Sequence, residues 1–382
     1  MASIGKRSCA LALALVLSLS LVLPARAADA KVSQVLSDTA NLVLTAASDP
    51  QVGPIGGEWA VIGLARSGAA CPATWYRTYY AVAETYTAAC RGILHEKKYT
   101  EYARLILALS ALGQDARDLA GYDLTKPLGD FNATVQQGTN GPIWALLALD
   151  SRNYPVPDAP KGKTQATRQK YIDRILATQL SDGGWSPSGG AADADLTAMA
   201  LQALAGYREQ GAVARALDRG IACLSLLQTE SGALTAWGNA TSESTAQGLL
   251  ALCALVLSPN DPRLVKNGHT LLDGLLTFYR PGQGFSHTDS AVSPMATEQA
   301  LLALAALRRA EAGQSSLYRM TDAPSLIAAA GQGLSGKHAD VTVSPVTCPG
   351  MTFDDIAGHP NQSAVEALAA RGIITGTGSG AF

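Results

Sequence analysis

The sequence predicts an all-α protein, an α/α toroid of six inner and about six outer helices, and three observations lead to this fold class. Six segments rich in alanine and leucine carry almost no charge beyond their first turn. More amphipathic segments lie between them, and strand signals are almost absent. Because a helix that is apolar on most faces is buried on most faces, this alternation predicts inner helices ringed by outer ones. An open helical solenoid is the alternative.

The predicted elements alternate along the chain. The inner helices run over Gly57–Gly68, Thr100–Gly113, Asn140–Ser151, Asp193–Tyr207, Ser242–Leu255 and Pro294–Leu307. The outer helices run over Ala73–Leu94, Thr164–Gln179, Arg215–Gln228 and Pro262–Tyr279.

A second signature links the outer helices to the inner ones. Gln179 is followed by Gly183 and Trp185, and Gln228 is followed in the same way by a glycine and Trp237. A third copy is degraded. We expect the glutamine to bond loop backbone groups, the glycine to permit the turn and the aromatic ring to pack over the helix end. These residues are therefore interpreted as structural.

Composition limits the classes of function. The chain is 47% hydrophobic and 16% charged, and its formal net charge is −2. These values argue against disorder and against nucleic acid as a partner, since binding phosphates needs a basic excess. The cysteine spacing matches no zinc module, and we expect neither a metal nor a cofactor. Cys71 and Cys90 either bridge two helices or act as small buried apolar residues.

A targeting segment is predicted at the N-terminus. Lys6 and Arg7 precede an apolar run from Ala10 to Leu23, and Ala25-Arg26-Ala27 forms an A-x-A cleavage site. This order is typical of a secretory signal peptide over residues 1–27, and a retained anchor is the alternative. No later apolar run is long enough to cross a bilayer, so we expect an exported mature chain without a membrane span.

The repeats resemble those of squalene cyclases and the prenyltransferase β-subunit superfamily. The residues that carry the resemblance are the glutamine–glycine–tryptophan arrangement and the runs Gly56–Gly68, Asp195–Leu204 and Ser242–Gln247. They look most like the secreted bacterial prenyltransferase/squalene-oxidase repeat proteins, whose relatives include the toroid domain of cobalamin carriers. The resemblance implies a toroid over residues 28–335 and leaves the function open.

The C-terminal residues 351–382, after a linker over 336–350, resemble the first two-thirds of an S-layer homology repeat. Phe353-Asp354-Asp355-Ile356, His359 and Gly372-Ile373-Ile374-Thr375-Gly376 carry this resemblance. In that family such repeats bind secondary polymers of the bacterial cell wall, which implies a wall polymer as partner and a cell-wall or S-layer location. A chance glycine-rich tail is the alternative.

Two departures from the repeat bear on anchoring. Pro360 stands where the family has an aromatic residue, and the sequence stops at Phe382, before the helix whose arginine helps to bind the polymer. We therefore do not expect one partial repeat to anchor the chain by itself, and a truncated copy of a longer protein is one interpretation.

Polar and aromatic residues gather in the early turns of the predicted inner helices, which would line one mouth of a toroid. Capping and the helix dipole alone favour a carboxylate at such positions. Several side chains that converge on one cavity would instead form a binding site. The candidate ligand-binding residues are Glu58, Trp59, Tyr102, Trp144, Asp193, Asp195, Thr197, Glu243, Gln247, Glu298 and Gln299.

One alternative is a terpenoid cyclase. The run from Asp193 to Ala198 resembles the Asp-x-Asp-Asp-Thr-Ala motif of class II cyclases. The resemblance implies Asp195 as the acid that protonates an alkene, with Asp193 beside it. Leu196 replaces the last aspartate of the motif, which removes one carboxylate from the acid network. Class I ionisation and protein prenylation are not expected, since no Asp-Asp-x-x-Asp run is present and the histidines lie away from Cys253.

A second alternative is an enzyme that acts on polysaccharides. A glycosidase needs two carboxylates about 5 to 9 Å apart, which Asp195 with Glu243 or Glu298 could supply. Aromatic residues of one outer helix would form a sugar platform, or else pack against the protein: Trp75, Tyr76, Tyr79, Tyr80 and Tyr86. The interpretation we favour is a non-catalytic module that binds a small molecule or a glycan at the mouth, because the inner helices carry alanine and leucine where cyclases carry aromatic and acidic residues.

Overall fold

The protein is described by a computed structural model covering residues 31–289 and 291–327 and, with gaps, residues 353–374. It divides into two compact units, Met1–Pro324 and Ser325–Phe382. The signal peptide expected over residues 1–27 and the linker over 336–350 lie outside the described residues. These domain boundaries therefore stay predictions.

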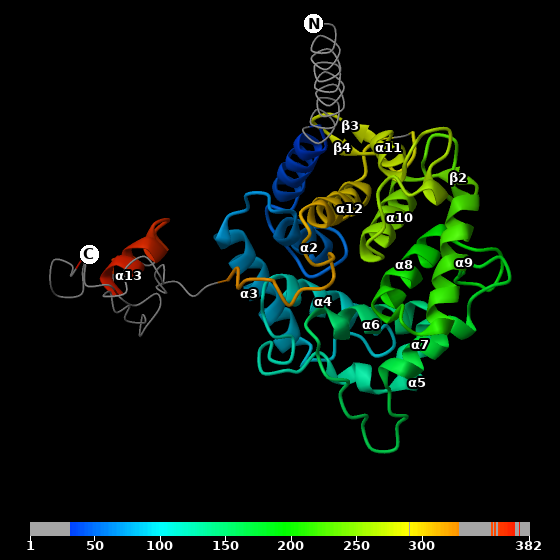
Figure 1. The fold of residues 1–382 in the computed structure, drawn as a ribbon. Helices are drawn as coiled ribbons and strands as arrows, with labels where there is room; N and C mark the ends of the chain where they lie inside the picture. The colour runs from blue at the N-terminus through cyan, green and yellow to red at the C-terminus, as the bar shows by residue number, and fades with distance from the viewer. Residues whose placement is uncertain are drawn as a thin grey trace, which may run out of the picture. The chain divides into compact units, whose positions relative to one another are not determined.

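Six helices of the first unit stand side by side in a closed ring. Each contacts the next, and the last contacts the first again (Figure 1). This closure confirms the α/α toroid and excludes the open solenoid. The inner helices are α2 (Glu58–Ser67), α4 (Thr100–Ala111), α6 (Asn140–Ser151), α8 (Ala194–Leu204), α10 (Ser242–Ala254) and α12 (Pro294–Glu311).

A second layer of helices surrounds this ring. It starts with a helix over residues 31–46. A hydrogen bond of 3.2 Å from the Tyr279 hydroxyl to Asp38 joins this helix to the last repeat. The other members are α3 (Ala73–Ala89), α5 (Phe131–Thr134) with the 3-10 turns η1 (Lys126–Gly129) and η2 (Val135–Gln137), α7 (Arg168–Ala177), α9 (Gly211–Leu227) and α11 (Leu271–Leu276).

The outer layer departs from the sequence prediction in three places. The helix over residues 31–46 and the short α5 were not predicted. The last outer helix was predicted over Pro262–Tyr279, but α11 keeps only six residues. It is preceded by the 3-10 turn η4 (Pro262–Leu264) and by a turn in which Asn267 and Gly268 both have positive φ, a backbone conformation that interrupts a helix.

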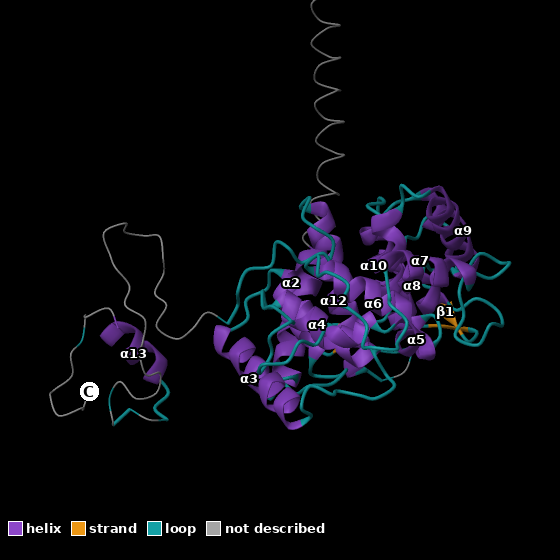
Figure 2. Cartoon of the chain, turned by 90° about the horizontal axis from the view of Figure 1, so that it is seen from below, coloured by secondary structure: helices purple, strands orange, loops and turns teal. Residues whose placement is uncertain are grey.

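Strands are minor elements within the described residues (Figure 2). Two antiparallel hairpins connect outer helices to inner ones, and each strand has two residues. They are β1 (Thr235–Ala236) with β2 (Asn239–Ala240), and β3 (Tyr279–Arg280) with β4 (Gly284–Phe285). Another 3-10 turn, η3 (Ala205–Tyr207), follows α8.

Small residues allow the inner helices to approach one another. Gly63 of α2 faces Leu301 of α12, and a methyl group built at Gly63 would lie 2.8 Å from a Leu301 methyl carbon. The alanine-rich composition that the sequence shows is therefore a packing requirement, since a larger side chain here would push apart the helices that close the ring.

The glutamine tie is confirmed at both complete copies. Gln179 Nε2 donates to the carbonyls of Gly183 and Ala216 at 2.7 and 2.9 Å. Gln228 Nε2 donates to those of Gly232 and Leu264, both at 3.0 Å. The outer helix is thereby bonded both to its own turn and to the next outer element.

The role predicted for Trp237 is wrong. Trp185 is fully buried and its backbone N–H donates to Thr197 Oγ1 over 2.9 Å. In the next repeat Leu234 takes this place and donates to Thr245 Oγ1 over 2.9 Å. Trp237 instead lies beyond β1 in the hairpin turn, where it is 85% exposed with φ 53°. The two repeats share a buried apolar side chain at this position, tryptophan in one and leucine in the other.

Three threonines of the inner helices repeat this tie. Thr197, Thr245 and Thr297 each accept a backbone N–H from the preceding connection through Oγ1, at 2.9 to 3.0 Å. Each bond therefore fixes the position of the connection relative to the inner helix that follows it.

The four cysteines of the first unit that the structure describes are free thiols: Cys71, Cys90, Cys223 and Cys253. Cys71 precedes and Cys90 follows α3, which has 17 residues. A helix of that length separates its ends by about 25 Å, far beyond the reach of a disulfide. The alternative of a Cys71–Cys90 bridge is therefore excluded.

The second unit has a small apolar core of its own. Phe353, Ile356 and Val365 are buried together, and Ile374 packs against them. Helix α13 (Gln362–Ala370) supplies Val365, and its start is held by Gln362, whose Oε1 accepts the Gly358 N–H over 2.9 Å.

Candidate functional site

A cavity of about 130 Å³ lies between the N-terminal halves of the inner helices. Five of the six inner helices contribute to its wall, together with one residue that follows α12. The lining residues are Trp59, Trp144, Asp195, Met199, Gln247, Gln299, Leu302 and Tyr318. A neighbouring cavity of about 190 Å³ shares the two tryptophans and is completed by Thr100, Arg104, Gln137 and Asn140.

Asp195 is the acidic group of the cavity wall. Its Oδ1 atom is buried and accepts no hydrogen bond from the described residues. Burial raises the pKa of this carboxyl to about 6, a hydrogen bond with Ser244 lowers it, and the charges of Asp193 and Glu243 raise it further. No described arginine or lysine forms an ion pair with Asp195.

Three glutamines form a chain of amides across three inner helices. Gln202 Nε2 donates to Gln247 Oε1 over 3.0 Å, and Gln247 Nε2 donates to Gln299 Oε1 over 3.1 Å. The Gln247 and Gln299 oxygens accept in this chain, whereas Gln202 Oε1 is buried and has no hydrogen-bond partner among the described residues. The Nε2 group of Gln299 is left as a donor beside the cavity.

Three aromatic rings also line the cavity. The Trp59 and Trp144 rings are 5.3 Å apart between centroids and tilted by 49°. Tyr318 meets Trp144 edge-on at 6.1 Å. The Tyr318 hydroxyl is buried and makes no hydrogen bond within the described residues, and burial raises its pKa.

Two of the predicted residues lie in the wall of the ring rather than on the cavity. Glu58 is fully buried and accepts from Arg104 Nε at 2.8 Å and from the Tyr79 hydroxyl at 3.1 Å. Burial raises its pKa, and the charge of Arg104 lowers it. Tyr102 is also buried and packs edge-on against Tyr99. Glu58 therefore joins α2 to α3 and α4, whereas the Tyr102 ring contact lies at the start of α4 itself.

Four other predicted residues are bonded to the protein itself. Asp193 caps α8 by accepting the Leu196 N–H at 2.8 Å, and Thr197 makes the tie to Trp185. Glu243 lies 2.7 Å from His287 Nδ1. Glu298 accepts the Gly56 N–H at 2.8 Å, and burial raises its pKa to about 7. None of the four lines the cavity.

The aromatic helix predicted as a possible sugar platform is a packing element instead. Trp75, Tyr76 and Tyr79 of α3 are buried. Trp75 Nε1 donates to the Ala47 carbonyl over 2.6 Å and so joins α3 to the first outer helix. The sugar platform is therefore excluded for these three rings.

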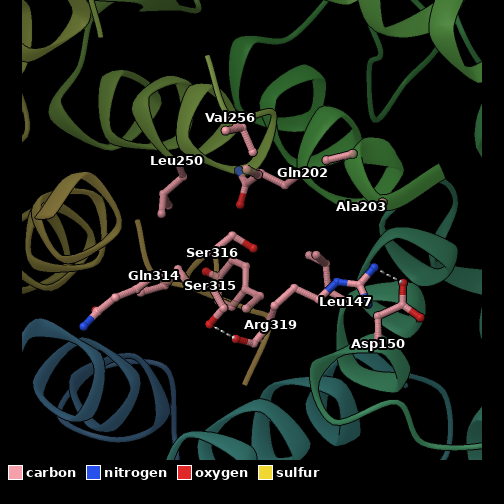
Figure 3. Close-up of a pocket in the computed structure, with 15 residues that line it drawn as sticks. Leu147, Asp150, Gln202, Ala203, Leu250, Val256, Gln314, Ser315, Ser316 and Arg319 are labelled. Carbon is pink, nitrogen blue, oxygen red and sulfur yellow. Dashed lines mark hydrogen bonds and ion pairs between the residues drawn. The ribbon is translucent and has the colours of Figure 1, made fainter. Parts of the chain in front are cut away.

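Residues 314–322, the closing segment, cross the opposite mouth of the ring (Figure 3). They line a cavity of about 260 Å³ together with the C-terminal ends of α6, α8 and α10. Arg319 pairs with Asp150 at 3.6 Å, and the Met320 N–H donates to the Ser151 carbonyl over 2.6 Å. Tyr318 lines both cavities, so its ring separates the two ends of the lumen.

A buried arginine fixes the closing segment to α2. The Arg66 guanidinium donates to Ser315 Oγ at 3.0 Å and to the Arg319 carbonyl at 2.8 Å, and it pairs with Asp322 at 2.9 Å. Arg309 of α12 donates to the Ser315 carbonyl at 2.9 Å. The segment is thus bound to three inner helices, α2, α6 and α12.

Sequence reasoning missed Met199, Leu302 and Tyr318. The first two follow the helical repeat of the predicted cavity residues on the same helices, which is a signal that could have located them. Tyr318 lies outside every predicted helix. One indirect sign was Arg66, a charged residue within a mostly apolar inner helix, because a buried arginine needs polar partners from elsewhere in the chain.

The described residues lack both a cluster of metal ligands and a membrane-spanning helix. They contain no group of three or more histidine, cysteine, aspartate or glutamate side chains arranged to hold a metal ion. They also contain no helix that is both long and apolar enough to cross a bilayer.

The comparisons with known proteins bear on both units. Residues 352–382 match the S-layer homology domain. This match confirms the resemblance of the C-terminal residues and indicates association with the bacterial cell surface. The comparison with curated sequences gives no match.

Solved structures are similar to part of this chain. One of them is ent-copalyl diphosphate synthase from Streptomyces platensis, with 23% sequence identity and a TM-score of 0.43. The similarity covers 65% of this chain and 49% of that one, so this chain corresponds to about half of the synthase. The fold itself is established by the closed ring of inner helices.

Proposed function

We propose that the protein is an exported, envelope-associated toroid that binds a small ligand, without catalysis, at the N-terminal mouth of its ring. The observation that carries the proposal is the convergence of Asp195, Gln299, Trp59 and Trp144 on one cavity from four different helices. Structural needs alone do not explain why Asp195 Oδ1 and the Tyr318 hydroxyl, two groups of the cavity wall, are buried without hydrogen-bond partners among the described residues.

The size of the cavity supports a small ligand. A volume of about 130 Å³ holds several water molecules but falls below the 300 to 1,000 Å³ typical of pockets for drug-sized molecules. The closing segment supports entry from one mouth only, because it occupies the other end of the lumen.

The residue beside Asp195 favours binding over the cyclase alternative. The class II motif has another aspartate directly after this acid, where the chain has Leu196. Leu196 is buried and supplies no second carboxylate. For a glycosidase, Glu298 is bonded to Gly56 and Glu243 to His287, so neither lines the cavity with Asp195.

A ligand screen tests the binding proposal. Mature protein is incubated with corrinoids, short isoprenoid diphosphates, monosaccharides and small amines, and melting is followed by circular dichroism. A ligand that binds only the native state raises the melting temperature. We expect a stabiliser whose effect is lost in Trp59→Leu and kept in Tyr86→Leu, a partly exposed aromatic of α3. Turnover of any compound that depends on Asp195 would contradict the proposal, as would the absence of a stabiliser.

The C-terminal unit supports the envelope part of the proposal, with a cell-wall polymer as its partner. The test is sedimentation of the full chain with purified walls from a bacterium that carries an S-layer. We expect binding that weakens when the secondary polymer is extracted from the walls, and when the chain is truncated after residue 335. Equal sedimentation of the truncated chain would contradict this part of the proposal.

A further inference from the structure

The groups around the 130 Å³ cavity have an unusual balance of charge. Asp195 is the one acidic side chain in its wall, and no basic side chain lines it. Arg104, which lines the neighbouring cavity, is already bonded to Glu58 and Glu101. An anionic carboxylate with a buried oxygen and no hydrogen-bond partner there is costly unless a positive charge joins it.

Charged neighbours of Asp195 increase the need for a positive charge beside it. Asp193 on the same helix and Glu243 on α10 both disfavour its ionisation, whereas His287 favours it. His287 is itself held 2.7 Å from Glu243. Ser244, which lies on α10, and the Tyr318 hydroxyl are neutral. The mouth therefore has an excess of negative charge that would attract a cation.

The aromatic side of the cavity suits the same kind of ligand. Trp59, Trp144 and Tyr318 line the same cavity as the Asp195 carboxylate. The ring centroids of Trp59 and Trp144 are 5.3 Å apart, and those of Trp144 and Tyr318 are 6.1 Å apart. Aromatic faces attract organic cations through the negative charge of their π systems, and the interaction strengthens when water is excluded. A carboxylate facing several aromatic rings recognises an ammonium group by both effects.

We infer that the ligand of this cavity is a small organic ammonium ion, held between Asp195 and the aromatic rings of Trp59, Trp144 and Tyr318. The inference rests on the proposed function and adds the chemical class of its ligand. The carboxylate neutralises the cation, the three rings surround its alkyl groups, and Gln299 Nε2 can donate to a neighbouring oxygen of the ligand.

A neutral sugar fits the site less well than a cation does. Sugars also stack on aromatic rings and accept hydrogen bonds from amides. A sugar hydroxyl could donate to Asp195 Oδ1, but it would leave the charge of this carboxylate without a counter-charge. The same cavity volume also disfavours chains of linked sugars.

The test compares a cation with its neutral shape analogue. Isothermal titration calorimetry of the mature full chain at pH 7.5 uses tetramethylammonium, choline, 3,3-dimethylbutan-1-ol, N-acetylglucosamine and the bulky tetrabutylammonium. We expect choline to bind at least ten times more tightly than the neutral alcohol, and tetrabutylammonium not to bind.

Two variants with the same change of charge locate the cation. Asp195→Asn should weaken choline binding at least tenfold. Asp193→Asn should change it less than threefold, because asparagine caps a helix as well as aspartate does and residue 193 does not line the cavity. Circular dichroism checks that both variants are folded.

The other outcomes separate the inferred ligand class from the proposed binding function. Equal affinity for choline and the neutral alcohol would overturn the inference, as would unchanged binding in Asp195→Asn. Binding of N-acetylglucosamine alone would overturn the inference and keep the proposed function. If no compound of this set or of the wider screen binds, both fall.

Discussion

At the scale of single residues, the buried acids give the protein an unusual response to pH. Asp195 has a pKa of about 6 in the fold against 3.8 when it is exposed, and Glu298 has about 7 against 4.5. A folded-state pKa that is raised means that the folded state binds more protons than the unfolded state between the two values. The free energy of unfolding should therefore fall as pH rises from about 4 to 7.

Asp195→Asn should remove part of this fall. We expect the variant to unfold with the wild-type free energy near pH 4 and to be more stable at pH 7.5, by about 2 kcal/mol after allowance for partial exposure of the carboxyl. Urea unfolding at both pH values measures the difference. A variant less stable than wild type at pH 7.5 would show that the Asp195 charge is compensated in the fold.

At the scale of elements, the threonine ties fix where each connection enters the ring. Thr197→Val keeps the shape of the side chain but leaves the buried Trp185 N–H without its acceptor. We expect a loss of about 1 to 3 kcal/mol in the free energy of unfolding. Thr197→Ser should retain most of the stability. Thr78→Val, an exposed change on α3, is the matched control and should cost little.

The contact between the first and last inner helices is a second test at this scale. Gly63→Val places a branched side chain against Leu301, so we expect α2 and α12 to separate and the protein to lose about 1 to 3 kcal/mol. Thermal unfolding measures the loss. A further change of Leu301→Ala should restore part of the stability by making room, and no restoration would mean that the two positions do not touch.

At the scale of the whole molecule, the closing segment makes the lumen open at one mouth. Arg66→Met removes the donors that hold residues 315, 319 and 322. We expect trypsin to cleave after Arg319 at least several times faster in this variant than in wild type, because proteases act on segments that detach. Arg117→Met, which breaks an exposed pair with Asp115 and a contact with the Tyr154 ring, does not touch the closing segment and should leave the cleavage rate unchanged.

The sequence predicts the ring better than the site within it. The alanine and leucine periodicity located all six inner helices, since burial on most faces leaves a strong pattern. It missed α5, which is too short to show one. The spacing from Gln179 to Trp185 is the same as that from Gln228 to Leu234, and this register would have identified Leu234 in place of Trp237.

The site was less predictable because first-turn residues of similar type do different work. Asp193 and Asp195 are two residues apart, yet one caps α8 and the other lines the cavity. Which of them faces the lumen depends on the rotation of the helix in the ring. The position of Tyr318 in the lumen depends on the path of the closing segment and on the burial of Arg66. Helical periodicity carries no information about either.

The most direct test of the account is the titration of the Asp195 carboxyl by NMR, with carbon-13 in the aspartate side chains and Asp195→Asn for assignment. The account predicts a pKa near 6 in the free protein, and a clear fall when choline is present at saturation, because a cation beside the carboxylate favours its charged form. A pKa near 3.8 that does not respond to choline would mean that Asp195 faces open water, and the acidic, aromatic cavity would not exist as described.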